Sequence, residues 1–319
     1  MTRRIIGVII TVALGVMRPA LAQDGQLLDA AAITWREEAL ARLETVEPTI
    51  RTILAQVDLK SMTYLSDGLK VKGYLAAPKR GDTLPCIIFN RGGNRAFGAL
   101  TDGYAARVLG KLAMWGYVVV ASQYRGNAGG EGREEFGGAD INDVLHLIPL
   151  LESLPQADAS RIGMYGWSRG GLMAYLALTK TPRIRAAVIG AGMSDAFDTV
   201  ARRLEMDARV FAEAIPDYTR HKEAALHARS PVRWAERLHK HTPILILHGS
   251  ADWRVHPTQA LAMASALYTS RHPFRLVFFE GGDHALSEYR EEVDSLVKAW
   301  LDRYVRDRTP WPSLEPHGR

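Results

Sequence analysis

Residues 161–179 read RIGMYGWSRGGLMAYLALT, and this stretch decides the fold because it predicts a buried strand that turns abruptly into a helix. The pattern Gly-x-Ser-x-Gly lies at the junction, with Ser168 between Gly166 and Gly170. Glycines at these two positions let the strand and the helix approach closely. We therefore expect the turn to expose the hydroxyl of Ser168.

The rest of the chain repeats this alternation of strand and helix. Apolar, strand-like runs occur at residues 84–90, 117–123, 161–167, 184–191, 243–249 and 274–280, and helical patterns at 104–116, 141–154, 169–179, 258–268 and 286–305. Strands that are apolar throughout suit a sheet covered on both faces, and intervening helices imply parallel crossovers. We therefore predict an α/β fold with a doubly wound, mostly parallel sheet.

Four further segments complete the predicted organisation. The stretch around Asp67-Gly68 alternates polar and apolar residues, which predicts an antiparallel hairpin. Apolar residues at helical spacing, interrupted at Pro48, predict an N-terminal helical segment at 23–58 before the main domain at 59–305. Residues 193–240 predict a helical cap over the strand ends, with a peripheral insertion as the alternative. The proline-rich residues 306–319 predict a flexible tail.

The first 22 residues have the features of a secretory signal peptide. Two arginines precede an apolar stretch at 5–16, which is shorter than the roughly 20 residues that a membrane span needs. We expect cleavage before Gln23 and an exported, soluble protein, periplasmic or secreted, with an uncleaved signal anchor as the alternative. Cleavage removes three arginines and lowers the net charge from +5 to +2, which favours no nucleic-acid partner. The single cysteine, Cys86, excludes an intramolecular disulfide.

Three residues predict nucleophilic catalysis. A serine hydroxyl needs a base beside it and a group that orients the base. Asp252 follows the strand-like run at 243–249, and His284 follows the run at 274–280, so both lie at the same sheet edge as Ser168. The order Ser, Asp, His is that of α/β-hydrolases. The alternatives that remain are Asp195, Asp198 and Asp283 for the acid, and His248 and His256 for the base.

Acyl transfer also needs hydrogen-bond donors for the oxyanion. The backbone N–H of Arg169, the residue after the nucleophile, is the first predicted donor. The second is Gly93, in the loop NRGGNR at residues 90–95, where glycines are free to turn their amides into the site. A plain structural turn is the alternative for this loop.

These motifs resemble the catalytic domain of the prolyl oligopeptidase family of serine peptidases. The segments GWSRGG, HGSADWRV and GGDH are similar to the family's nucleophile, acid and histidine loops, and SQYRGNAGGEG and EFGGADINDV to its Tyr-Arg-Gly segment and the stretch that follows. The likeness runs from about residue 60 to 305. It implies an α/β-hydrolase fold and an acyl-enzyme that water hydrolyses.

The resemblance also implies that Tyr124 and Arg125 shape the wall of the site, with Arg125 paired to a carboxylate such as Asp140 and favoured for a structural role. Trp167, the residue before Ser168, is a further candidate for this wall. Two features depart from the family. The usual His-Gly-Gly-Pro is Arg-Gly-Gly-Asn here, at residues 91–94, and we expect no β-propeller because only residues 26–58 precede the predicted domain.

The expected function is hydrolysis of a small peptide or acyl ester, with a serine-type peptidase favoured over a carboxylesterase. A non-catalytic binding protein with the same fold is a further alternative. Neither His-Glu-x-x-His nor Gly-x-Gly-x-x-Gly occurs, so we expect no metal and no cofactor.

Overall fold

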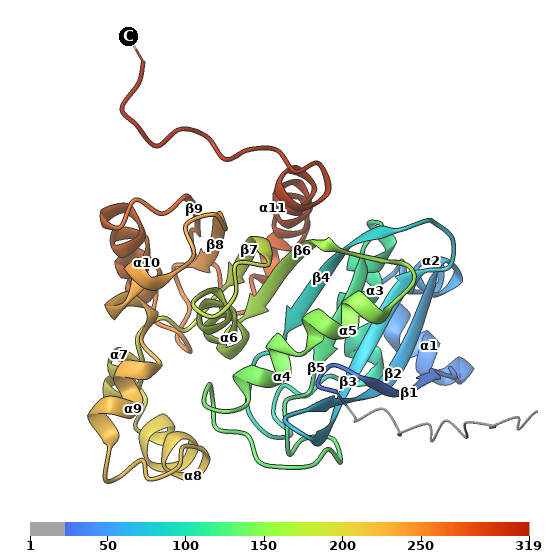
Figure 1. Cartoon of the computed structure of the whole chain (residues 1–319), viewed down its shortest axis with the longest axis horizontal. Helices are drawn as coiled ribbons and strands as arrows, with labels where there is room; N and C mark the ends of the chain where they lie inside the picture. Colours follow the sequence, from blue (N-terminus) through green and yellow to red (C-terminus); the bar gives the residue numbers. More distant parts are fainter. Residues whose placement is uncertain (1–22, 319) are drawn as a thin grey trace, which may run out of the picture.

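The structure, a computed structural model, describes residues 23–318 (Figure 1). The predicted signal peptide, residues 1–22, lies outside the described residues. Within residues 23–318, no helix has both the length and the apolar character of a membrane span.

A nine-stranded sheet organises the described residues, in the order β1-β2-β3-β5-β4-β6-β7-β8-β9. The strands are β1 Leu27–Ala32, β2 Val57–Ser66, β3 Leu69–Pro78, β4 Leu84–Asn90, β5 Val118–Ser122, β6 Ala157–Trp167, β7 Ile184–Gly190, β8 Ile244–Gly249 and β9 Phe274–Phe279. Pairing is antiparallel from β1 to β5 and parallel from β5 to β9. The predicted doubly wound, mostly parallel sheet is confirmed.

Helices cover both faces of the sheet (Figure 1). They are α1 Glu37–Glu44, α2 Ile50–Gln56, α3 Asp102–Met114, α4 Ile141–Leu145, α5 Leu147–Ser153, α6 Arg169–Leu178, α7 Ala196–Arg202, α8 Ala212–Ala214, α9 Lys222–Ala228, α10 Thr258–Thr269 and α11 Arg290–Leu301, with 3-10 turns at Pro231–Arg233, Ala235–Arg237 and Ser287–Tyr289 and π-helical turns at Met206–Phe211 and Asp302–Arg306. One apolar core lies beneath α5, α6 and α10, and the other beneath α2, α3 and α11. Strand β4 serves both, since Cys86 and Ile88 face the first core and Ile87 and Phe89 the second.

The N-terminal segment departs from the prediction. Leu27–Ala32 form strand β1, which pairs antiparallel with β2 at the edge of the sheet, where a helix was expected. The edge of β2 offers hydrogen-bond partners for the backbone of residues 27–32. These bonds outweigh the helical preference of the three alanines in β1. Helices α1 and α2 do follow, on either side of Pro48. The predicted hairpin is confirmed, because Asp67 and Gly68 join β2 to β3 with φ of 52° and 74°.

The cap segment, residues 193–240, connects β7 to β8 and contains α7, α8 and α9. Figure 1 shows these helices together at the end of the molecule opposite to α1 and α2. Residues 307–318 contain no helix or strand (Figure 1). They still contact the domain, since the ring of Trp311 lies 5.1 Å from that of His241 and Glu315 pairs with Arg271 (2.5 Å).

Candidate active site

Ser168 occupies a strained turn between β6 and α6. Its φ of 59° and ψ of −121° lie in a region that non-glycine residues rarely adopt. Flanking glycines make this turn possible, because a Cβ on Gly166 would lie 2.1 Å from the carbonyl oxygen of Gly170, and one on Gly170 would lie 1.9 Å from that of Asn90. The N–H of Ser168 donates to the carbonyl of Gly190 on β7 (2.9 Å). The turn therefore has the sharp, strained geometry of a nucleophile elbow, as the glycine pattern predicts.

Asp252 and His284 meet at the ends of β8 and β9. The Nδ1–H of His284 donates to Oδ2 of Asp252 (2.8 Å). Oδ1 of the same carboxylate accepts the backbone N–H groups of Arg254 (2.8 Å) and Val255 (3.0 Å). Because an ionised carboxylate only accepts hydrogen bonds, this contact leaves Nε2 of a neutral His284 without its proton. His284 is therefore in the tautomer that a general base requires.

A second imidazole supports the acid. His248 on β8 is fully buried, and its Nε2 lies 3.3 Å from Oδ2 of Asp252 and 2.9 Å from the carbonyl oxygen of Val255. Burial alone would raise the pKa of Asp252, but the hydrogen bonds from His248 and His284 outweigh it and hold that pKa well below its usual range. The four-residue spacing between His248 and Asp252 is visible in the sequence, which suggested His248 only as an alternative base.

Ser168 and His284 line the same cavity, with a volume of about 340 Å³. The loop after β4 forms one side through Gly92, Gly93 and Phe97. The cap segment contributes Met193, Met206 and Val210, which make much of the lining apolar. No aspartate or glutamate is among the described residues that line the cavity, whereas Arg203 and Arg254 are. The cavity therefore suits an uncharged or anionic group better than a cation.

Both predicted oxyanion donors lie beside Ser168. Arg169 is the first residue of α6, where a backbone N–H has no partner within its own helix. The loop after β4 passes close to the nucleophile, because a Cβ on Gly92 would lie 3.2 Å from the Cβ of Ser168. Gly93 lines the cavity with a φ of +68°, and a Cβ there would lie 2.0 Å from the carbonyl oxygen of Phe97. This conformation requires glycine at position 93.

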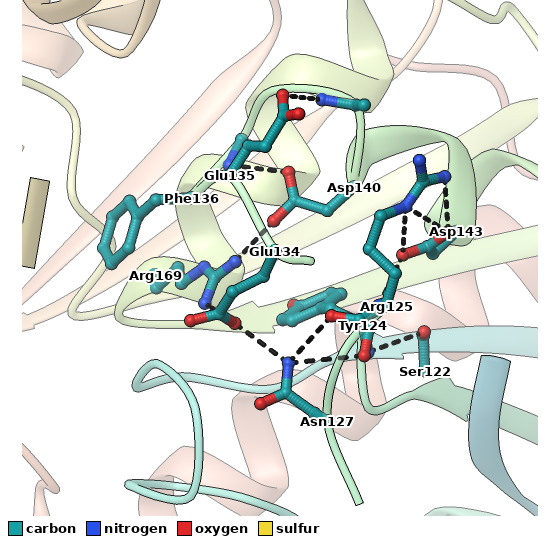
Figure 2. A network of polar contacts seen from close by, with 12 residues as sticks. Ser122, Tyr124, Arg125, Asn127, Glu134, Glu135, Phe136, Asp140, Asp143 and Arg169 are labelled. Atoms are coloured by element: carbon teal, nitrogen blue, oxygen red, sulfur yellow. Dashed lines mark hydrogen bonds and ion pairs between the residues drawn. The ribbon is translucent and has the colours of Figure 1, made fainter. Parts of the chain in front are cut away.

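Of the residues predicted for the wall of the site, Trp167 lies at the cavity and Tyr124 does not. Trp167 lines the cavity, and its Nε1–H donates to the carbonyl of His284 (2.9 Å). The expectation for Tyr124 is wrong, because this side chain is fully buried and its hydroxyl donates to the carbonyl of Arg91 (3.0 Å). With a φ of +63°, the chain at Tyr124 turns its ring beneath the guanidinium of Arg169, 4.7 Å from the ring centre (Figure 2).

The predicted partner of Arg125 is also wrong. Its guanidinium pairs with Asp143 (2.8 Å) and Asp67 (2.7 Å), whereas Asp140 pairs with Arg169 (2.5 Å). Figure 2 shows these two arginines bound to different carboxylates. The two acids lie one helical turn apart at the start of α4, so sequence proximity alone does not decide which one faces Arg125.

The alternative acids have other partners. Asp195 caps α7 by accepting the N–H of Phe197 (2.9 Å), Asp198 pairs with Arg202 (2.7 Å), and Asp283 accepts the N–H of Ala285 (2.9 Å). The alternative base His256 contacts the hydroxyl of Thr258 (2.8 Å). Within residues 23–318, Asp252 is the carboxylate that contacts the ring of His284.

One group of three possible metal ligands occurs among the described residues, formed by Asp24, Asp67 and His146. It does not line the cavity, and Asp67 already accepts from Arg125 (2.7 Å) and Asn142 (2.8 Å).

Known proteins with related sequences and structures place the chain in a family. The model of the prolyl oligopeptidase family matches residues 107–308. The uncharacterized peptidase YtmA of Bacillus subtilis is 30% identical over 248 residues, which are 77% of this chain and 93% of that protein. The acylamino-acid-releasing enzyme of Homo sapiens is 27% identical over 213 residues, or 61% of this chain and 28% of that enzyme.

Among solved structures, an acylaminoacyl peptidase of Pyrococcus horikoshii superimposes with a TM-score of 0.68 at 24% identity, covering 84% of this chain and 45% of that one. The chain thus spans under half of the length of the human and Pyrococcus enzymes. The structural likeness supports the fold, and the sequence matches identify the family. The chain therefore belongs to the prolyl oligopeptidase family of serine peptidases, and it is a serine hydrolase with the α/β-hydrolase fold.

Proposed function

We propose that the protein cleaves small peptides through an acyl-enzyme on Ser168, with His284 as the general base and Asp252 as the residue that orients it. One observation carries the proposal: the bond between His284 and Asp252 (2.8 Å) and the strained turn of Ser168 occur at a single cavity. The turn exposes the nucleophile, and the carboxylate selects the tautomer of the base.

The reaction has two halves, acylation of Ser168 and hydrolysis of the acyl-enzyme, and each half includes two proton transfers through His284. Nε2 of His284 takes the proton of Ser168 as Oγ attacks the substrate carbonyl, and the N–H groups of Arg169 and Gly93 stabilise the oxyanion. His284 then protonates the leaving amine as the C–N bond breaks. Water repeats the sequence on the acyl-enzyme and releases a carboxylic acid. Asp252 remains ionised throughout and stabilises the imidazolium.

The lining of the cavity supports substrates without a free ammonium group near the scissile bond. A peptide N-terminus would find no carboxylate among the described lining residues, and it would face Arg203 and Arg254. An N-blocked or acylated residue avoids this repulsion, and its apolar side chain fits against Met193 and Met206. The name of the human relative, an acylamino-acid-releasing enzyme, supports the same preference. Small acyl esters fit the same apolar cavity, so a carboxylesterase is the second candidate.

We also propose export to the periplasm, based on the composition of residues 1–22. The test is to express the full chain, fractionate the cells and sequence the N-terminus of the protein. A mature chain beginning at Gln23 in the periplasmic fraction supports the proposal, and an uncleaved chain in the membrane fraction contradicts it.

Fluorophosphonate labelling of the purified protein tests the catalytic assignment. We expect labelling of the wild type and of Ser270→Ala, a control at the end of α10 outside the cavity lining, but not of Ser168→Ala. N-acetyl-aminoacyl anilides, free aminoacyl anilides and p-nitrophenyl esters then separate the candidate substrates. Faster hydrolysis of the blocked anilide supports the peptidase, and cleavage of esters alone supports the carboxylesterase. A folded wild type that resists labelling would refute both.

A further inference from the structure

Arg91 is a fully buried guanidinium whose described partners are backbone carbonyls. It donates from Nε and Nη2 to Gln123 (3.1 and 2.9 Å), from Nη1 to Gly92 (3.0 Å) and from Nη2 to Arg95 (3.1 Å). Within residues 23–318, no carboxylate lies within 4.0 Å of it. Burying a charge without an ionic partner costs desolvation free energy. The hydrogen bonds to backbone carbonyls offset part of this cost for Arg91.

The contact with Gly92 decides which way the next N–H points. The carbonyl of Gly92 and the N–H of Gly93 belong to one peptide unit, and this unit is trans, as are all the described peptides. In a planar trans peptide the C=O and N–H point in opposite directions. Because the carbonyl points to the guanidinium of Arg91, the N–H of Gly93 points away from it. No described residue accepts this N–H, and Gly93 lines the cavity.

The opposite orientation of this peptide is disfavoured by the same guanidinium. Rotating the Gly92–Gly93 unit by about 180° would bring the N–H of Gly93 against Nη1 of Arg91, so that donor faces donor. The carbonyl would then turn toward the cavity, where it would repel an oxyanion. Glycines flank this peptide on both sides, and because glycine has no Cβ its backbone dihedral angles favour one orientation of the peptide less strongly than those of other residues would. A contact that selects one orientation therefore matters more here.

Arg169 and Glu134 hold the rest of the loop. Nη1 of Arg169 donates to the carbonyl of Gly93 (3.1 Å) and to Oε2 of Glu134 (2.7 Å). Oε1 of Glu134 accepts the backbone N–H of Arg95 (2.8 Å), so one carboxylate joins the loop to the helix that follows the nucleophile. The ring of Tyr124 lies against both guanidinium groups, 5.1 Å from Arg91 and 4.7 Å from Arg169.

Arg91 remains protonated at neutral pH. Burial, together with the nearby charge of Arg169, lowers the pKa of Arg91 to about 10. All the donors of the guanidinium are therefore present under ordinary assay conditions.

We propose that Arg91 is a positioning residue that holds the Gly92–Gly93 peptide with its N–H toward the oxyanion. The inference rests on the proposed function, and it assigns a role to the arginine that stands where related peptidases were expected to have histidine. The geometry that points to it is the contact between Arg91 and the carbonyl of Gly92.

The test compares Arg91→Gln and Arg91→Lys with Arg229→Gln. Arg229 is a matched control because it is also buried and donates to backbone carbonyls, those of Glu135, Phe136 and Ala225, away from Gly92 and Gly93. For each protein, kcat and KM are measured with an N-acetyl-aminoacyl ester or anilide, together with Ki for an N-acyl aminoboronic acid. The boronic acid forms a tetrahedral adduct on Ser168 that places an oxygen where the oxyanion forms.

We expect Arg91→Gln to lower kcat by about 10²-fold, in the range for loss of one oxyanion donor, with KM within about twofold of the wild type. Its Ki for the boronic acid should rise in parallel with the loss of kcat. Arg91→Lys keeps the charge and one donor direction, so it should recover part of both. Arg229→Gln should lower thermal stability while changing the ratio of KM to Ki by less than about threefold.

Unchanged kcat and Ki in a folded Arg91→Gln would overturn the inference, as would equal weakening of substrate and boronic acid. If Arg91→Gln does not fold, Arg91→Lys decides by the same ratio of KM to Ki. A wild type that neither reacts with fluorophosphonate nor hydrolyses any substrate would instead refute the proposed function, and the inference would fail with it.

Discussion

Two loops at the candidate site follow parallel strands, yet different parts of the chain hold them. The acid loop, residues 250–255 after β8, is organised by near neighbours, because Asp252 accepts the N–H groups two and three residues ahead. The oxyanion loop, residues 91–100 after β4, is held by side chains 23, 39 and 76 residues from their contacts, those of Gln123, Glu134 and Arg169. The acid loop can therefore be recognised from a short motif, whereas the oxyanion loop depends on tertiary contacts.

The largest expected effect tests the acid loop. Asp252→Asn should lower kcat by about 10⁴-fold, because His284 would lose the acceptor that selects its tautomer. Steady-state kinetics with a blocked anilide measures this loss. Asp195→Asn, which alters a helix cap, should leave kcat within about threefold of the wild type. A larger loss in Asp195→Asn than in Asp252→Asn would show that the acid has been assigned to the wrong loop.

The next effect tests the long-range support of the oxyanion loop. Glu134→Gln removes one of the two carboxylates that pair with the buried guanidinium of Arg169. We expect kcat to fall about tenfold and the free energy of unfolding to decrease by about 3 kcal/mol. Urea titration and kinetics on the same preparation separate the two losses. A variant with reduced stability and normal kcat would show that Glu134 stabilises the fold without positioning the loop.

Acid pH should destabilise the folded protein through a carboxyl group that contacts each loop, Asp252 for the acid loop and Glu134 for the oxyanion loop. Burial would raise the pKa of Asp252 and of Glu134, but their hydrogen bonds and charged partners outweigh it and lower both pKa values below their usual range. A carboxyl group with a lowered pKa in the folded state contributes stability above its unfolded pKa of about 4, and this contribution is lost as the pH falls through the folded value. The free energy of unfolding should therefore decrease below about pH 4.

The variants Asp252→Asn and Glu134→Gln should each show a shallower decrease than the wild type, measured by urea titration between pH 3 and pH 7. Equal slopes in all three proteins would mean that other carboxyl groups dominate the acid response.

The smallest expected effect concerns the exposed side of the oxyanion loop. Glu213 of the cap segment pairs with the side chain of Arg95 (2.5 Å), and both side chains are about half exposed. Solvent screens such pairs, so Glu213→Gln should change the free energy of unfolding by less than about 1 kcal/mol and kcat by less than about twofold. It is the surface counterpart of Glu134→Gln, and a comparable loss of kcat in both would show that the cap also positions this loop.

Much of the fold was predictable because its signals are local. Apolar runs placed strands β4 to β9, and turn chemistry at Asp67-Gly68 placed the hairpin. Strand β1 was missed because its pairing with β2 depends on a partner about 30 residues away, and alanine-rich sequence gives no sign of it. The partners of Arg125 and the buried position of Tyr124 were missed for the same reason, since packing decides which face of the chain a side chain meets.

The sequence by itself determined the family of this protein, the order of Ser168, Asp252 and His284, and the glycines that the turn at Ser168 requires. These features follow from backbone sterics and from motifs only a few residues long. The tertiary structure alone decided how the oxyanion loop is held and what lines the cavity. Buried charges need hydrogen-bond partners, and the fold decides where these come from. Arg91 finds one in the loop after β5, and Glu134 finds partners in the loop after β4 and in α6.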